Sequence, residues 1–220
     1  MNTKLLTPAL IIVILLAALA GWAFGNNSSN RNAEESIPTA TTTPNATGTP
    51  SLIIEPVGPV AEAPNLNRPI NISANLSKEA AAKAVARIKE LNDELRSDGD
   101  LYSSWLDLAL QRKLIGDHVA AEEIWIYITK TWVDDPIAHN NLADLYLMAF
   151  HDNDQAETYL LKAISKDPTQ MMFYENAYSF YRFVKKDLVR AREILEEGIT
   201  RNPSNAEGLR KLLADLKAAS

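Results

Sequence analysis

Residues 139–168 read HNNLADLYLMAFHDNDQAETYLLKAISKDP. Ala143 and Ala156 are small and stand at helical spacing from large neighbours, so two helices can approach closely at these positions. Tyr146 and Leu160 are large enough to fill the space beside them. The stretch therefore predicts a pair of packed helices that ends at a proline.

The same pattern recurs along the chain. Large residues of the first helix are 34 and then 35 residues apart, at Trp105, His139 and Tyr174. Small residues of the second helix are 35 apart, at Ala121, Ala156 and Ala191. One such pair cannot bury its apolar face alone, so successive pairs have to stack. The repeat predicts three helix-turn-helix units at 101–135, 136–168 and 169–203, with no strand alternation between them.

This pattern resembles the tetratricopeptide repeat (TPR) family over residues 101–203. The residues that carry the resemblance are a large first-helix residue, a Leu-Ala pair, a tyrosine, a second-helix alanine and a closing proline, as in Trp105, Leu108-Ala109, Leu142-Ala143, Tyr146, Ala156, Tyr174, Tyr181, Pro168 and Pro203. Arg112 departs from the pattern where a tyrosine is usual, and Tyr178 where a small residue is usual. The second and third units also carry one extra residue between their helices.

Two further helices are predicted at the ends of the repeats. Residues 77–100 form an N-terminal capping helix that begins at Ser77, and residues 204–220 form a C-terminal one. The C-terminal helix carries leucines on one side and polar residues on the other, at Leu209, Leu212, Leu213, Leu216, Arg210, Lys211, Asp215 and Lys217. The fold class is therefore all-α: an α-solenoid of three TPR-like units with capping helices.

The N-terminal residues 5–25 carry no charge. A helix of that length spans the roughly 30 Å hydrocarbon core of a bilayer, so the run predicts a transmembrane anchor. Lys4 precedes the run, which favours a cytoplasmic segment 1–4 and an exported remainder. A cleaved signal peptide is the alternative, because Ala18-Leu19-Ala20 is a small-x-small site behind an apolar run.

Residues 26–76 have a different composition. Seven of the eleven prolines lie there, among many Asn, Thr and Ser residues. Such a stretch buries too little apolar surface to offset the entropy of ordering. We expect a disordered linker that holds the repeats away from the membrane.

Composition excludes several classes of function. The formal net charge of -6 leaves no basic excess for binding nucleic acid. The chain has no cysteine, which excludes disulfides, thiol nucleophiles and zinc-thiolate sites. The three histidines are not spaced as metal ligands, and no glycine-rich phosphate loop exists. We therefore expect no enzyme, no cofactor and no metal.

The resemblance implies where a ligand would bind. In TPR proteins, the first helices of the units line a concave surface that binds peptides. The polar candidates on these helices are Asp107, Lys113, Asn140, Asn141, Asp144, Glu175, Asn176 and Arg182. Beside them stand Leu106, Leu110, Met148, Ser179 and Phe183. A solvated polar face without a ligand is the alternative interpretation of the same residues.

The chain is similar to bacterial membrane-anchored TPR proteins of the cell envelope. The resemblance implies a single-pass protein of the cytoplasmic membrane that serves as a scaffold or assembly factor. Its repeats would bind a protein or peptide partner on the extracytoplasmic side. Two alternatives remain: an exported soluble chaperone-like peptide binder after signal cleavage, or a structural spacer without a specific ligand.

Overall fold

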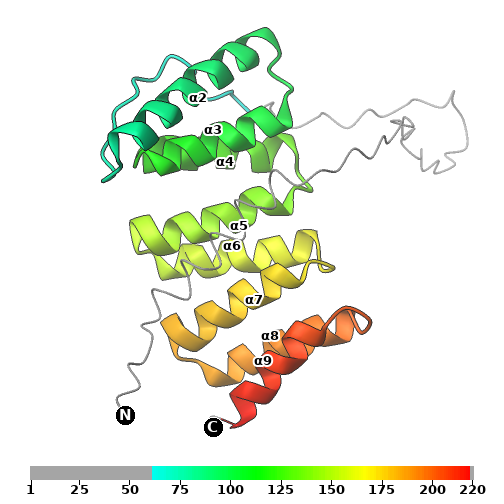
Figure 1. Cartoon of the computed structure of the whole chain (residues 1–220). Helices are drawn as coiled ribbons and strands as arrows, with labels where there is room; N and C mark the ends of the chain where they lie inside the picture. Colours follow the sequence, from blue (N-terminus) through cyan, green and yellow to red (C-terminus); the bar gives the residue numbers. More distant parts are fainter. Residues whose placement is uncertain (1–60, 219–220) are drawn as a thin grey trace, which may run out of the picture. The chain divides into compact units, whose positions relative to one another are not determined.

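The computed structural model describes residues 61–218, which fold into helices stacked one on another in chain order (Figure 1). The expected all-α class is confirmed for these residues, since they contain no strand. The expected segment 1–4, the anchor at 5–25 and the linker up to residue 60 lie outside them. Among residues 61–218, none of the helices combines the length and the hydropathy that crossing a membrane requires.

Eight α-helices and two π-helical turns make up the described part of the chain. In order they are α2 (Lys78–Ser97), α3 (Tyr102–Leu114), α4 (His118–Thr131), α5 (Pro136–Leu145), η1 (Tyr146–Phe150), α6 (Asn153–Lys166), α7 (Met171–Ser179), η2 (Phe180–Lys185), α8 (Leu188–Arg201) and α9 (Glu207–Ala218). Three hairpins follow from the sequence repeat: α3 packs on α4, α5 on α6, and α7 on α8. Helices α2 and α9 pack on the two ends of this series.

The second helix of each hairpin begins at an aspartate. Asp117, Asp152 and Asp187 are 35 residues apart, and each carboxylate accepts a hydrogen bond from a backbone N–H of the first turn. An aspartate at this position satisfies a donor that the helix itself leaves free. The repeat therefore shows not only in the packing residues but also in the helix starts.

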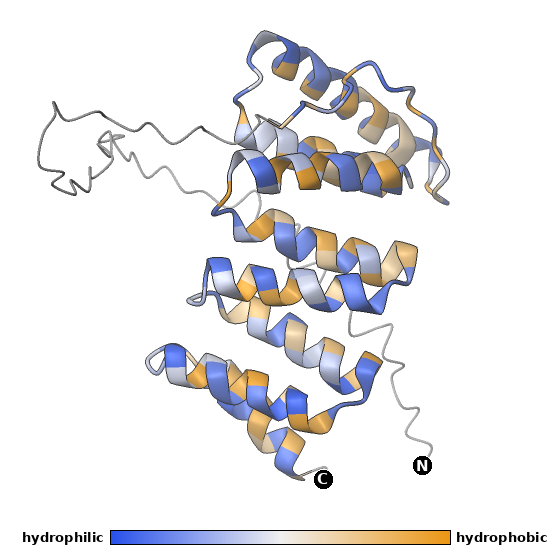
Figure 2. Cartoon of the chain, turned by 180° about the vertical axis from the view of Figure 1, so that it is seen from behind, coloured by the Kyte–Doolittle hydropathy of each residue, from blue (hydrophilic) through white to orange (hydrophobic). Residues whose placement is uncertain are grey.

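The apolar side chains form two core clusters. One joins buried residues of α2 to α5, and the other joins buried residues of α5 to α9. Tyr146 and Tyr159, whose rings stack with centroids 5.4 Å apart, pack against both clusters. Hydrophilic and hydrophobic residues alternate along each helix (Figure 2), as expected for helices that bury one face.

The extra residue of the second and third units is absorbed by η1 and η2. Each π-helical turn ends at a residue in the left-handed conformation, His151 (φ 55°) or Lys186 (φ 56°). Gly116, the residue 35 before His151, has φ 83°. A π-turn holds one residue more than an α-turn, so the hairpins keep equivalent turns despite their different lengths.

Lys186→Gly is expected to raise the free energy of unfolding by about 0.5 to 1 kcal/mol. The left-handed conformation costs a residue with a Cβ about 1 to 2 kcal/mol, and the greater freedom of glycine in the unfolded chain offsets part of the gain. Lys130→Gly, on the exposed surface of α4, is the control and should instead lose about 1 kcal/mol. Urea denaturation measures both, and equal losses in the two variants would contradict the turn geometry.

His139 takes the place of the large aromatic residue in the second unit. It is buried and its ring stacks on Tyr159, with centroids 5.9 Å apart. Burial lowers the pKa of His139, and Lys162 and Lys166 lower it further against the opposing effect of Asp135. The folded protein therefore holds His139 neutral more strongly than the unfolded chain does.

This lowered pKa predicts a pH dependence of stability. Below the unfolded value of about 6.5, the unfolded chain binds a proton that the folded protein resists, so stability falls as the pH falls. We expect a slope of up to about 1.4 kcal/mol per pH unit between pH 6.5 and the folded pKa. His139→Phe keeps an aromatic ring and removes the titration. Parallel stability curves for the two proteins between pH 7 and 5.5 would show that His139 has no part in it.

One helix crossing depends on a glycine. A Cβ at Gly198 of α8 would lie 2.6 Å from Leu209 Cδ1 and 2.8 Å from Tyr174 Cγ. Both neighbours are buried, on α9 and α7. Gly198 therefore allows α8 to pack between the two helices without a gap.

The segment ahead of α2 differs from the expected linker. Residues 65–76, here called the strap, pack against α2 and the α3–α4 turn, with the apolar side chains Leu66, Ile70 and Leu76 on the first core cluster. The backbone N–H groups of Ser73 and Ala74 both donate to the Ile115 carbonyl, at 2.9 and 3.1 Å. At least the last part of the proline-rich region thus belongs to the folded unit.

Arg112 holds the strap. The residue is 1% exposed, and its guanidinium donates to the carbonyl oxygens of Arg68 and Pro69 at 3.0 and 2.9 Å. It also donates to Asp117 at 3.1 Å. An arginine at this position therefore has a structural reason: its side chain reaches the backbone of the strap.

Candidate functional site

Polar contacts join α2 to α3 and the first helices of consecutive hairpins to one another. The eight polar candidates belong to α3, α5–η1 and α7–η2. The surface of these helices that carries them is called the inner face below. Arg87 of α2 donates to Asp107 of α3 at 2.8 Å. Lys113 of α3 pairs with Asp144 of α5. The second contact thus brings together two of the candidates, which are 31 residues apart in sequence.

Asp107 is engaged on both carboxylate oxygens. Arg87 approaches one oxygen, and the Gln111 amide donates to the other at 2.9 Å. Arg87 also pairs with Glu90, and the two carboxylates raise the pKa of its guanidinium. Because Asp107 already has both partners, it acts first as a contact between α2 and α3.

The Asn140 side chain lies inside the joint between α5 and α7. It is 3% exposed, and its Oδ1 accepts a hydrogen bond from Asn176 Nδ2 at 2.9 Å. Of the two asparagines, only Asn176 is partly exposed. This pair satisfies a buried amide and fixes the register of the two helices.

Asn141 and Glu175 are not engaged in this way. Among residues 61–218, neither side chain has a hydrogen-bond or ion-pair partner, and both are partly buried. Burial raises the pKa of the Glu175 carboxyl. Both side chains therefore keep unused capacity to bind a polar group.

Arg182 is held by aromatic rings. Its guanidinium lies 5.7 Å from the ring centroid of Tyr178 and 5.2 Å from that of Phe183, and it donates to the Tyr178 hydroxyl. Within the described residues no carboxylate pairs with it. The rings fix the position of the charge but do not neutralise it.

Apolar side chains on the inner face are exposed. Leu110 is 37%, Leu114 47% and Met148 39% exposed. Sequence reasoning missed Leu114, although a signal existed. The positions of Leu114, Met148 and Phe183 are 34 and then 35 residues apart, which is the spacing of Trp105, His139 and Tyr174.

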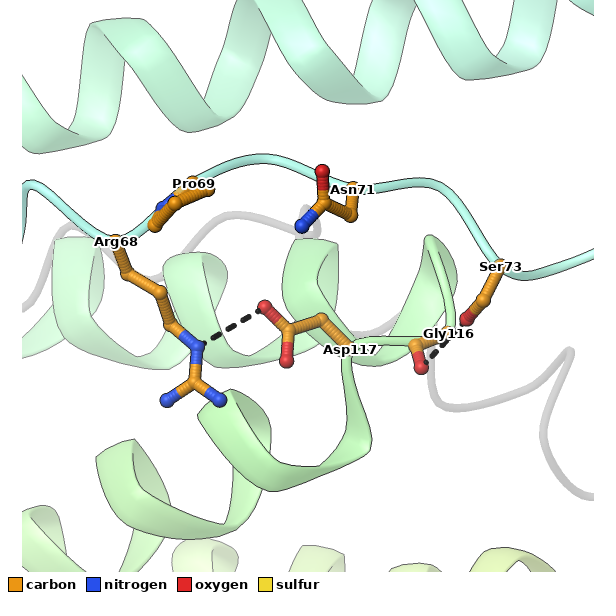
Figure 3. A pocket seen from close by; sticks show the side chains of 6 residues that line it. All are labelled: Arg68, Pro69, Asn71, Ser73, Gly116 and Asp117. Carbon is orange, nitrogen blue, oxygen red and sulfur yellow. Dashed lines mark hydrogen bonds and ion pairs between the residues drawn. The ribbon is translucent and has the colours of Figure 1, made fainter.

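A cleft of about 210 Å³ lies elsewhere, between the strap and the α3–α4 turn. In Figure 3 the Arg68 side chain points across it toward Asp117, at 3.4 Å, and Ser73 points toward Gly116. Arg68 also pairs with Glu123 at 2.7 Å. The polar groups that line this cleft hold the strap in place, so the cleft is part of the contact between the strap and the α3–α4 turn.

The chain was compared with known proteins. No protein-family model matches it, and no curated protein matches it.

In the part of the chain that the structure describes, no three His, Cys, Asp or Glu residues are grouped to hold a metal ion. The inner face carries polar side chains that have no partner within residues 61–218, and it carries exposed apolar side chains. Both kinds of side chain can contact a ligand.

Proposed function

We propose that this chain is a membrane-anchored interaction scaffold of the TPR type that binds a protein or an extended peptide on its inner face. The observation that carries the proposal is the contrast within that face. Asp107, Lys113 and Asp144 are paired. Among residues 61–218, by contrast, the Asn141 side chain has no hydrogen-bond partner, and Arg182 donates to the Tyr178 hydroxyl but has no carboxylate partner. Amide groups such as Asn141 suit an extended backbone, because they both donate and accept hydrogen bonds.

Equivalent contacts at equal spacing support the TPR part of the proposal. The Tyr146 hydroxyl donates to Glu122, and the Tyr181 hydroxyl donates to Glu157 at 2.7 Å. Both members of the second pair stand 35 residues after those of the first. Each contact joins the first helix of one hairpin to the second helix of the hairpin before it.

The anchor part rests on residues 5–25 alone. A retained anchor predicts that the protein stays in the membrane pellet after alkaline carbonate extraction. It also predicts that protease added outside spheroplasts removes the helical repeats. A mature chain that begins at Gly21 and is found in the soluble fraction would favour the exported soluble binder instead.

The inner face can be tested by crosslinking the full-length protein in cells. A photoreactive residue at position 141 is expected to capture a partner, while the same residue at Lys162, exposed on α6, is not. With the captured partner in hand, Asn141→Ala should weaken binding by about 0.5 to 1.5 kcal/mol through one lost hydrogen bond. Arg182→Glu should weaken an acidic partner most at low salt.

Lys162→Glu is the control for both substitutions, and helical circular dichroism checks that each variant folds. A partner that responds to Lys162→Glu but ignores Asn141→Ala and Arg182→Glu binds elsewhere. A chain that captures nothing from position 141 would support the spacer interpretation.

A further inference from the structure

Helix α9 continues the sequence repeat beyond the three hairpins. Its leucines stand 35 residues after buried tyrosines of the third hairpin: Leu209, Leu213 and Leu216 follow Tyr174, Tyr178 and Tyr181. Helix α9 also packs on α8 as α5 packs on α4 and as α7 packs on α6. It therefore takes the position of a further first helix, at the end of the stack opposite α2 (Figure 1).

One side of α9 lacks the cover that the other first helices have. Ala109, Ala143 and Tyr178 hold the position of Leu213 in the three hairpins, and they are 0%, 2% and 2% exposed. Their helices pack against the second helices α4, α6 and α8. Leu213 is only half-buried, and within residues 61–218 the helices packed on α9 are the preceding α7 and α8. In the described part of the chain, the side of α9 that would meet a second helix is therefore open.

Two cations flank Leu213 on this open side. Arg210, Leu213 and Lys217 share one side of α9 because they stand at i, i+3 and i+7, and they are called the end stripe below. Arg210 and Lys217 are exposed, and within residues 61–218 neither has a carboxylate partner. Seven residues of helix separate them by about 10 Å. The end stripe is thus an apolar side chain between two positive charges.

The three hairpins show what packs against a first helix in this fold. Each second helix buries an alanine and, four residues later, a large apolar residue: Ala121 and Trp125, Ala156 and Leu160, and Ala191 and Leu195. A third buried residue follows three positions further on in each helix. The open side of α9 continues this packing, so its occupant is a helix with an alanine at i and apolar residues at i+4 and i+7.

Charge argues against a second copy of α9 as this occupant. Arg210 precedes Leu213 by three residues and Lys217 follows it by four. Two antiparallel copies that met at Leu213 would therefore place Arg210 of one beside Lys217 of the other. In a parallel pair, each cation would meet its own equivalent. Both arrangements bring like charges together, whereas a partner helix with acidic residues at its flanks would pair with them.

We propose that the end stripe binds an amphipathic helix of another protein, which takes the place that α4, α6 and α8 hold in the three hairpins. The partner helix carries the alanine and apolar residues described above, with glutamate or aspartate at the flanks that face Arg210 and Lys217. Helix α9 is not part of the inner face, so this inference does not depend on the proposed binding function.

Synthetic helices test the proposal without an identified partner. The probe is a labelled peptide of about 20 residues, since shorter isolated helices are marginal in water. It carries Ala, Leu and Ala at i, i+4 and i+7 and Glu at the flanking positions. Fluorescence anisotropy measures its binding to the full chain in mild detergent. We expect the Glu peptide to bind, and the same peptide with Lys at the flanks to bind at least about tenfold more weakly. A version with a central proline, which breaks the helix, should not bind.

Three variants of α9 then locate the peptide. Leu213→Gln should weaken binding of the Glu peptide at least about tenfold. Arg210→Glu should weaken it about fivefold and should strengthen binding of the Lys peptide. Lys211→Glu is the matched control: it makes the same charge reversal at the next residue, on the other side of α9 from Leu213, and should change the affinity less than about twofold.

Circular dichroism checks that each variant folds. Arg210→Glu alters an exposed side chain, so it keeps the test valid if Leu213→Gln disturbs α9. The proposal is overturned if the Glu peptide does not bind, if its binding ignores both variants, or if the proline version binds equally well. Loss of binding in Asn141→Ala would place the peptide on the inner face and would overturn the proposal too. Sedimentation of the full chain tests the second copy: a dimer that Leu213→Gln dissociates would assign the end stripe to self-association instead.

Discussion

Arg112→Ala is expected to lower the free energy of unfolding by about 3 to 5 kcal/mol. The guanidinium is buried and donates to two backbone carbonyls and to Asp117, so its loss removes a donor from all three acceptors and leaves the two carbonyls without this side-chain partner. Hydrogen bonds from a charged group contribute about 1.5 to 3 kcal/mol each, and removing one partner of a buried charge is strongly destabilising. Arg68 still pairs with Asp117, which keeps the expected loss within this range.

The matched control is Arg192→Ala, which removes an arginine from the exposed surface of α8 and should change stability by less than about 0.5 kcal/mol. Urea denaturation gives both values. Limited proteolysis gives a second measurement, the position of cleavage. The wild-type chain should resist cleavage after about residue 65, whereas the Arg112→Ala variant should be cut within the strap. A protease-sensitive strap in the wild type, with little loss of stability in the variant, would contradict the role of Arg112.

Gly198→Val is expected to lower the free energy of unfolding by about 2 to 3 kcal/mol. The new Cβ alone would meet Leu209 and Tyr174 closer than carbon atoms approach each other, and Val adds two more carbons. Overpacking of this kind typically costs about 1 to 3 kcal/mol. Valine is the better helix former by a few tenths of a kcal/mol, which is too little to offset the clash.

Gly208→Val separates the two effects. Gly208 is exposed on α9, and a Cβ there would meet only the end of the Glu175 side chain, at 3.2 Å. The gain in helix propensity is similar at both sites, whereas the clash with the buried side chains of Leu209 and Tyr174 exists only at Gly198. Thermal unfolding of both variants should therefore give a large fall for Gly198→Val and little change for Gly208→Val. Similar melting temperatures would mean that α8 can move away from α7 and α9 at little cost.

The helices were predictable because their signal is periodic. Ser77 and the aspartates before α4, α6 and α8 mark helix starts, and alanines 35 residues apart mark the close crossings. The strap carries no such period. Many of its hydrogen bonds run through its own backbone carbonyls and N–H groups, which every sequence possesses, so composition alone favoured disorder. Arg112 in place of a tyrosine was the one departure that pointed to it.

The candidate site was predictable as a set of positions but not as a set of roles. Helical spacing places Asn140 and Asn141 side by side, yet the first lies in a joint between helices and the second keeps its amide free of partners within residues 61–218. A difference of about 100° around a helix decides between the two, and residue type does not encode it. Leu114 was not among the apolar residues predicted for this surface, although its spacing from Met148 and Phe183 follows the repeat.

The strap also determines how the folded unit would respond to mechanical load. Tension applied to the chain ahead of residue 65 would act first on the contacts of Arg68, Pro69 and Ser73 with α3 and the α3–α4 turn. These bonds are spread along the strap, so several of them share the load before any one breaks. Helix α2, which follows the strap in sequence, would be pulled only after they fail. A single-molecule pulling trace should therefore show release of the strap before α2 unfolds, at a force that falls in Arg112→Ala.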